Sequence, residues 1–208
     1  MTRSTSNVGR FVCAMPAVGL SHPHLFRTYR VRENMNVNCK IWEAARATTA
    51  APTFFKRISI GEQGQFAEEY MDGGLRCNNP VKQVIQEARM IFGEKRAIGI
   101  IVNIGSGHPG SVNYSKPSGL QRFLPTKLID ILKSIATDCE SVTEEMHAIF
   151  ADTPGTYIRL NVTHGAGKIS LEEWEKMVEV QGYTKEYLKG FEVSKDIDVV
   201  AAKLCGTK

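Results

Sequence analysis

The sequence predicts an α/β fold in which helices cover a largely parallel β-sheet, as one domain over residues 1–208. Three observations support this fold class. Short apolar runs typical of strands alternate with segments of helical periodicity. A strand–helix–strand unit is expected over residues 66–104. The composition, with 42% hydrophobic and 23% charged residues, is that of a globular chain with a sizeable core.

Three strands and one helix are predicted before residue 72. The strands are expected at Gly9–Met15, at His24–Arg32 and at Phe66–Met71, each bounded by turn-forming residues. Lys40–Ala51 is rich in alanine and is expected to form a helix. This helix should end before Pro52, because the residue that precedes a proline avoids the α region.

The best-marked helix follows Asn79, which is placed to cap it, with Pro80 in its first turn and Gly93 at its end. Its apolar residues follow helical spacing: Val81, Val84, Ile85, Ala88 and Phe92. Ile98–Ile104 is then a continuous apolar strand, of the kind that is buried on both faces of a sheet. With the strand at Phe66–Met71, this order predicts a right-handed parallel crossover.

Residues 128–149 are expected to form a long amphipathic helix. Its apolar residues recur at alternating steps of four and three: Leu128, Leu132, Ile135, Cys139, Val142, Met146 and Ile149. This seam of three heptads suits a coiled coil or a partner helix, so the helix is a candidate protein-binding surface. Ile129, Ile131 and Phe150 widen the apolar stripe, which favours packing on the sheet.

The last third of the chain contains one predicted strand and a helical tail. Thr156–Val162 alternates apolar and polar residues, which predicts a half-exposed strand. Ser170–Leu204 is expected to be helical, with a capping box formed by Ser170 and Glu173. Gly182 and Gly190 are expected to break this tail into pieces.

The five cysteines are widely spaced and form no C-x-x-C pair. This spacing argues against a disulfide framework or a zinc site, and for a reducing, intracellular setting. His22-Pro-His24 is the one close histidine pair. Because no third ligand lies nearby in the sequence, this pair is interpreted as a surface loop, and neither a metal nor a cofactor is expected.

The charge pattern bears on partners and location. Residues 1–60 hold nine basic and two acidic residues, while the whole chain has a net charge of +4. The basic residues are spread over several elements, which argues against nucleic-acid binding. They indicate either a solvated, mildly basic face or a surface that tolerates anionic headgroups. The chain has no apolar run long enough to span a bilayer and no apolar secretion signal, so it is expected in the cytoplasm or peripheral to membranes.

Asp72-Gly73-Gly74 is the first candidate site. It follows a strand, at the position where open α/β sheets gather functional groups. The two glycines permit positive φ and the close approach of another backbone or of a substrate. An ordinary Asp-Gly turn is the alternative.

The second candidate is Gly105–Gly110, which fits the dinucleotide-binding pattern G-x-G-x-x-G after a strand. The residues that follow do not predict a helix, and no acidic residue ends a second strand about 20 residues on. A glycine turn is therefore favoured over nucleotide binding. Ser106 and His108 lie too close in sequence to align as a nucleophile and its base.

Three segments, taken in order, resemble patatin-like phospholipases, with most similarity to their fungal and calcium-independent branch. They are IWEAARATTAAPTFF at Ile41–Phe55, YMDGGLRCNNP at Tyr70–Pro80, and NIGSG at Asn103–Gly107. Tyr157–Val162 and parts of Leu171–Leu188 also look like the C-terminal part of that branch. The resemblance covers most of the chain.

This resemblance implies a three-layer α/β/α sandwich that hydrolyses acyl esters of lipids with a serine–aspartate dyad and no histidine. The D-G-[AG] motif of the family falls on Asp72, Gly73 and Gly74, so Asp72 would be the general base and the glycines motif residues. Burial in an apolar cleft would raise the basicity of this carboxylate. The nucleophile motif G-x-S-x-G and a glycine-rich oxyanion loop are absent from these 208 residues. The sequence is therefore interpreted as the C-terminal part of such a domain, inactive alone.

Three function classes follow. The first is acyl-ester hydrolysis of a lipid or phospholipid at a membrane surface, with this chain supplying the aspartate. The second is a non-catalytic binding module or pseudoenzyme of the same fold, which meets a partner through the 128–149 helix or the basic face. The third is nucleotide binding at Gly105–Gly110.

Overall fold

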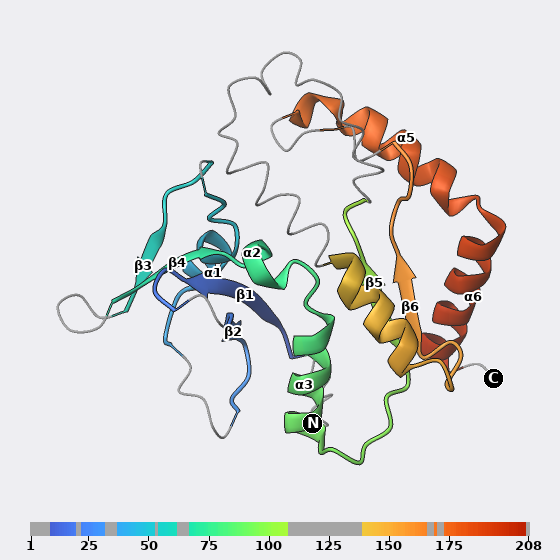
Figure 1. Cartoon of the computed structure of the whole chain (residues 1–208), viewed down its shortest axis with the longest axis horizontal. Helices are drawn as coiled ribbons and strands as arrows, with labels where there is room; N and C mark the ends of the chain where they lie inside the picture. Colours follow the sequence, from blue (N-terminus) through green and yellow to red (C-terminus); the bar gives the residue numbers. More distant parts are fainter. Residues whose placement is uncertain are drawn as a thin grey trace, which may run out of the picture. The chain divides into compact units, whose positions relative to one another are not determined.

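The computed structural model describes residues 9–19, 22–31, 37–52, 54–61, 67–107, 139–165, 169 and 173–206. Helices and strands are mixed along them, as the α/β class predicts. The described residues form two compact units, one that ends at Glu94 and one that begins at Lys95. Each unit has its own sheet, with four strands in the first and two in the second (Figure 1).

The sheet of the first unit has the strand order β2-β1-β4-β3. Its strands are β1 (Phe11–Pro16), β2 (His24–Arg27), β3 (Ile58–Ile60) and β4 (Glu68–Asp72). All three pairings are antiparallel, so the prediction of a largely parallel sheet is wrong here. Periodicity predicts that a segment is a strand but does not name its partner, and the short connection after β1 lets the chain fold straight back as β2. The strand β3 was not predicted, because three residues are too few to show alternation.

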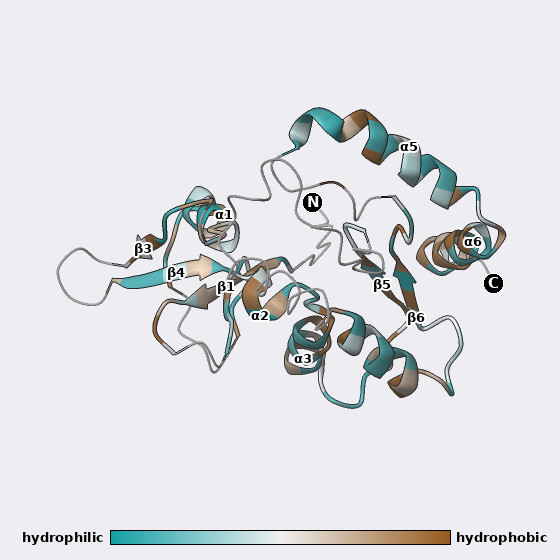
Figure 2. Ribbon diagram, turned by 45° about the horizontal axis from the view of Figure 1, so that its top comes forward, coloured by the Kyte–Doolittle hydropathy of each residue, from teal (hydrophilic) through white to brown (hydrophobic). Residues whose placement is uncertain are grey.

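Helix α1 (Ile41–Thr48) packs on this sheet. Its Ala47 is fully buried in one cluster with Ala14 of β1 and Tyr70 of β4. Small side chains at the contact let the helix backbone approach the strands closely, which explains the alanine-rich sequence. Along β4, hydrophilic residues give way to apolar ones toward the end that lies under α1 (Figure 2).

Two helices follow β4. Helix α2 (Gly74–Cys77) was not predicted, whereas α3 (Val81–Phe92) agrees with the prediction. The N-cap residue of α3 is Pro80, and the Oδ1 atom of the buried Asn79 accepts a hydrogen bond from the Val81 N–H at 3.4 Å. Gly93 ends α3 with a φ of 91°, as the sequence predicts.

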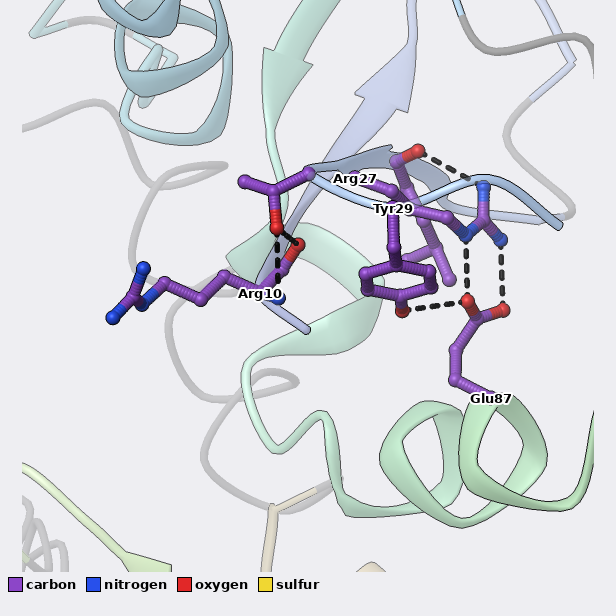
Figure 3. Close-up of polar contacts among 6 residues, drawn as sticks. Arg10, Arg27, Tyr29 and Glu87 are labelled. Carbon is purple, nitrogen blue, oxygen red and sulfur yellow. Dashed lines mark hydrogen bonds and ion pairs between the residues drawn. The ribbon is translucent and has the colours of Figure 1, made fainter. Parts of the chain in front are cut away.

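A buried ion pair joins α3 to β2 (Figure 3). Arg27 donates two hydrogen bonds to the Glu87 carboxylate, from Nε at 2.6 Å and from the terminal nitrogen at 2.8 Å. The Tyr29 hydroxyl donates a third, at 2.7 Å. The two charged side chains are only 7% and 4% exposed. Their mutual neutralisation allows both charges to lie in the interior.

The second unit is built on a parallel pair, β5 (Ile101–Ile104) and β6 (Tyr157–Leu160). The predicted parallel crossover between β4 and β5 is therefore wrong, because the two strands belong to different sheets. A strand within the predicted Thr156–Val162 is confirmed, but its expected alternation of buried and exposed residues is wrong, because Tyr157 and Ile158 are both buried. The Tyr157 ring contacts the rings of His147 and Phe150.

Residues 139–149 are helical. Cys139, Val142 and Met146 are buried, so this part of the predicted seam packs inside the unit, as the core interpretation expects. Ile149 is 56% exposed. The earlier residues of the seam, Leu128, Leu132 and Ile135, lie outside the described part of the chain.

The tail forms a short 3₁₀ turn (Trp174–Lys176), α5 (Met177–Leu188) and α6 (Phe191–Cys205). The predicted break at Gly190 is confirmed. The break predicted at Gly182 is wrong, because α5 continues through this residue; a single glycine costs a helix only about 1 kcal/mol.

Apolar and polar residues alternate around α6 (Figure 2). Lys203 of α6 donates hydrogen bonds to the carbonyls of Gly99 and Gly155. Ser170 of the predicted capping box lies outside the described residues.

Among the described helices, none combines the length and the apolar character needed to cross a bilayer.

The Glu87→Gln variant should lose about 3–5 kcal/mol of unfolding free energy, because it leaves the Arg27 charge buried without a counter-ion. Urea unfolding at pH 7 measures this loss. The Arg27 guanidinium lowers the pKa of Glu87, so the stabilisation is present above about pH 4.3 and is lost as the pH falls through the lowered pKa. The control is Glu69→Gln, which removes an exposed pair with Arg57 and should cost less than about 1 kcal/mol. Equal losses in the two variants would contradict this account.

Candidate functional site

Asp72 is the last residue of β4 and lies opposite Ala14 of β1. The end of α1 holds the same stretch of backbone. The Asp72 N–H donates to the Ala50 carbonyl at 3.1 Å, and the Gly73 N–H donates to the Thr48 carbonyl at 3.3 Å. The position of the carboxyl group is therefore fixed by β1 on one side and by the α1 terminus on the other.

Position 73 has no room for a side chain, so it requires glycine. A Cβ atom added there would lie 2.2 Å from the Cys13 carbonyl oxygen, which is far inside van der Waals contact. The predicted close approach of another backbone is thus confirmed, and that backbone is β1. The predicted use of positive φ is wrong, because Gly73 has a φ of −63° and Gly74 is not among the positive-φ glycines. The two residues instead lead into α2.

The Asp72 carboxyl group is half-buried and has a specific partner. Its Oδ1 accepts a hydrogen bond from the Gly74 N–H at 2.6 Å. Burial raises the pKa of Asp72 above its ordinary value, and the Gly74 hydrogen bond opposes that shift in part. A carboxylate with a raised pKa is a better proton acceptor than one in water, which is the property that a general base needs.

Three residues that sequence reasoning did not connect with the loop lie beside it. The Thr48 hydroxyl donates to the Cys13 carbonyl at 2.5 Å, next to Gly73. The Cys77 thiol, at the end of α2, donates to the Cys13 sulfur at 3.0 Å. Thr48 and Cys77 fall within the quoted motif segments, but Cys13 lies outside them, so only the strand pairing reveals it.

The second candidate site is Gly105–Gly110, and its described residues, 105–107, form a close turn after β5. A Cβ atom at Gly105 would lie 2.3 Å from Asn161 Oδ1 and 2.6 Å from an Arg159 nitrogen. Gly107 has a φ of 119°, and its N–H donates to Asn161 Oδ1 at 2.9 Å. These contacts explain both glycines by packing within the second unit, as the turn interpretation expects. The rest of Gly105–Gly110, with His108, lies outside the described residues.

His24 is the first residue of β2, which confirms the start of the strand predicted over His24–Arg32. The loop interpretation of the His22–His24 pair is therefore wrong for His24. Its ring contacts those of Phe26 and Tyr70, and burial lowers the pKa of His24. The described residues bring no three His, Cys, Asp or Glu side chains together in a way that could hold a metal ion.

Comparison with known proteins bears on the segment that contains α1, Asp72 and the first turn of α3. Residues 16–85 match the family model described as patatin-like phospholipase. This segment is similar to patatin-like phospholipases. The predicted resemblance to the family is thereby confirmed, and the mixed helices and strands of the structure agree with its α/β fold.

Three relatives extend the similarity beyond residues 16–85. Human calcium-independent phospholipase A2-gamma is 33% identical over 129 residues, which cover 59% of this chain and 14% of that protein. The mouse 85/88 kDa calcium-independent phospholipase A2 is 28% identical over 212 residues, or 80% of this chain and 25% of that protein. An Arabidopsis protein named probable inactive patatin-like protein 9 is 24% identical, covering 74% of this chain and 42% of its own length. The chain thus spans less than half of each of these relatives.

Gly73→Ala should destabilise the patatin-like segment by about 1–3 kcal/mol or more, because the new methyl group overlaps the Cys13 carbonyl. Chemical denaturation checks this value. Gly182→Ala is the matched control: its Cβ meets nothing within 4 Å and it lies inside α5, so it should stabilise the protein by roughly 0.5–1 kcal/mol. A neutral effect at Gly73 would disprove the close approach.

Asp72→Asn should raise the unfolding free energy at pH 7 by roughly 0.5–1 kcal/mol, because it removes a charge that burial disfavours. The amide oxygen keeps the Gly74 hydrogen bond, while the unfavourable buried charge is removed. Because folding raises the pKa of Asp72, the wild type regains this stability as the pH falls through that raised pKa, and the two proteins should match below about pH 4. Thermal unfolding from about pH 3 to 8 tests this, with the exposed Asp152→Asn as the control, which should stay within about 0.5 kcal/mol.

Proposed function

We propose that this chain contributes the general-base aspartate, Asp72, to a serine–aspartate dyad that hydrolyses acyl esters of phospholipids at a membrane surface. The observation that carries the proposal is the position of Asp72 inside the patatin-like segment, half-buried and anchored through one carboxylate oxygen. The names of the relatives, which are phospholipases A2, support the substrate class.

The geometry suits proton transfer. Gly74 holds Oδ1 of Asp72, which orients the carboxylate and leaves Oδ2 to accept a hydrogen bond from a serine hydroxyl. As the serine oxygen attacks the ester carbonyl carbon, its proton passes to Asp72 and then to the departing alcohol. The raised pKa of Asp72 brings this carboxylate closer to the basicity that such a transfer requires.

The 208 residues contain no G-x-S-x-G sequence that could supply the serine. We therefore propose that residues 1–208 supply one half of the dyad and that a polypeptide segment with that motif and oxyanion-hole donors supplies the other. Without donors for the oxyanion and without the nucleophile, the chain by itself should not turn over esters.

A second candidate is a non-catalytic module of the same fold. It is favoured by the relative whose name marks it as probably inactive, and by the absent nucleophile motif. Such a module would bind lipid or a protein without using the basicity of Asp72. Within the described part of the 128–149 seam, a protein partner could contact Ile149, which is exposed, whereas Cys139, Val142 and Met146 are buried.

A chimera separates the two candidates. The segment of human calcium-independent phospholipase A2-gamma that precedes the matching stretch would be joined to this chain, and hydrolysis of a fluorogenic phospholipid in vesicles would be measured. The chimera should be active, and Asp72→Asn should lower its rate by about 10²–10⁴-fold, because the general base is lost. The control Asp152→Asn changes an exposed acid in the same way and should retain full activity.

Residues 1–208 alone are the reference in the same assay and should show no turnover. Turnover by the isolated chain that Asp72→Ala abolishes would show that a nucleophile lies within it, against the proposal. Vesicle binding by the isolated chain that is unchanged in Asp72→Asn, together with an inactive chimera, would favour the non-catalytic module.

A further inference from the structure

Two thiols that are 64 residues apart in sequence lie side by side in the first unit. The sulfur atoms of Cys13 on β1 and Cys77 at the end of α2 are 3.0 Å apart. Their side chains are 7% and 6% exposed and share an apolar cluster with Leu25 and Phe11. A disulfide requires the sulfur atoms to close by about 1 Å more, to about 2.05 Å.

The two thiols are not equivalent. Cys77 donates the hydrogen bond and Cys13 accepts it, which lowers the pKa of Cys13. The Arg27 charge acts in the same direction, while burial and the Glu87 charge oppose it. The thiolate is the reactive form of cysteine, and the hydrogen bond that Cys77 donates favours Cys13 as the nucleophile, with Cys77 as the resolving partner.

We infer that Cys13 and Cys77 form a reversible disulfide when the protein meets a hydroperoxide. The Cys13 sulfur attacks one peroxide oxygen and becomes a sulfenic acid, and with hydrogen peroxide the other oxygen leaves as water. The Cys77 sulfur then attacks the sulfenic sulfur, which forms the S–S bond and releases a second water. The two thiols lose two electrons in total, and these reduce one peroxide to two waters.

Such a bond would fasten β1 to α2 across the Asp72-Gly73-Gly74 loop. Gly73 already rests against the Cys13 carbonyl, and α2 begins at Gly74, so both ends of the loop would be tied to the same strand. The disulfide itself does not depend on the proposed hydrolase function. Its formation and its effect on the loop can be measured without any lipid substrate.

Mass spectrometry tests the bond directly. The protein would be treated with hydrogen peroxide, alkylated and digested with trypsin, which releases residues 11–27 with Cys13 and residues 77–82 with Cys77. These two peptides should appear linked, two hydrogen atoms lighter than their sum, and should separate after dithiothreitol. Cys13→Ser and Cys77→Ser should each abolish the linked species, whereas the exposed Cys205→Ser should retain it.

The wild-type digest is decisive even if a cysteine variant fails to fold. Separate alkylation of Cys13 and Cys77 after peroxide, or pairing of either with Cys39, would overturn the inference. Amide hydrogen exchange over residues 73–77 provides the second readout and should slow in the oxidised protein, with the change reversed by dithiothreitol. An exchange rate that is identical in both redox states would overturn the fastening of the loop.

Discussion

The first unit depends on one close contact, where the backbone at Gly73 meets the carbonyl oxygen of Cys13. This contact is what allows β4 to end against β1 while the chain turns directly into α2. The Thr48 hydroxyl donates to the same carbonyl, so the end of α1 meets the same point. Three elements from distant parts of the sequence are thereby held together at the residue that carries the candidate carboxylate.

The two acidic residues Asp72 and Glu87 show how different surroundings shift the pKa of a carboxyl group in opposite directions. Arg27 and Tyr29 hold both oxygens of Glu87, and this lowers its pKa. For Asp72 the described residues provide one backbone N–H and no charge that lowers its pKa, so burial dominates and the pKa rises. A carboxylate that is paired with a cation stabilises the fold, whereas a carboxylate that burial makes more basic can accept a proton.

Local sequence signals were sufficient for most of the individual elements. The helix after Pro80, its end at Gly93, and the strands around β1, β4 and β6 agree with the prediction because each depends on residues close together in the chain. The strand β5 begins at Ile101 and not at Ile98, and its Ile104 is 74% exposed, so the expected burial on both faces is wrong. The predicted parallel pairing of the strands was wrong for the first unit, since pairing depends on contacts between distant segments. The helix break expected at Gly182 was also wrong, because a helix can absorb the cost of one glycine.

In the candidate site, too, local features could be predicted and contacts between distant segments could not. Asp72, Gly73 and Gly74 could be selected from the sequence because they form a short motif in a recognisable context. The reason for Gly73, and the presence of Cys13 beside Cys77, could not be selected, because the 64 residues between these cysteines give no sign of the pairing of β1 with β4. Sequence reasoning found the chemical group, and the strand register supplied its neighbours.

The parallel pairing of β5 with β6 has a consequence for synthesis on the ribosome. Ile101 pairs with Tyr157, so this sheet cannot begin to form until the chain has been made well beyond its first strand. The antiparallel sheet of the first unit needs nothing after Asp72 and can pair while β6 is still untranslated. The pairing of β5 with β6 is also slower, because it must close a longer loop of chain. A nascent chain should therefore pass through a stage in which β5 lacks its partner β6, which leaves the edge of β5 open to pairing with other chains or with a chaperone.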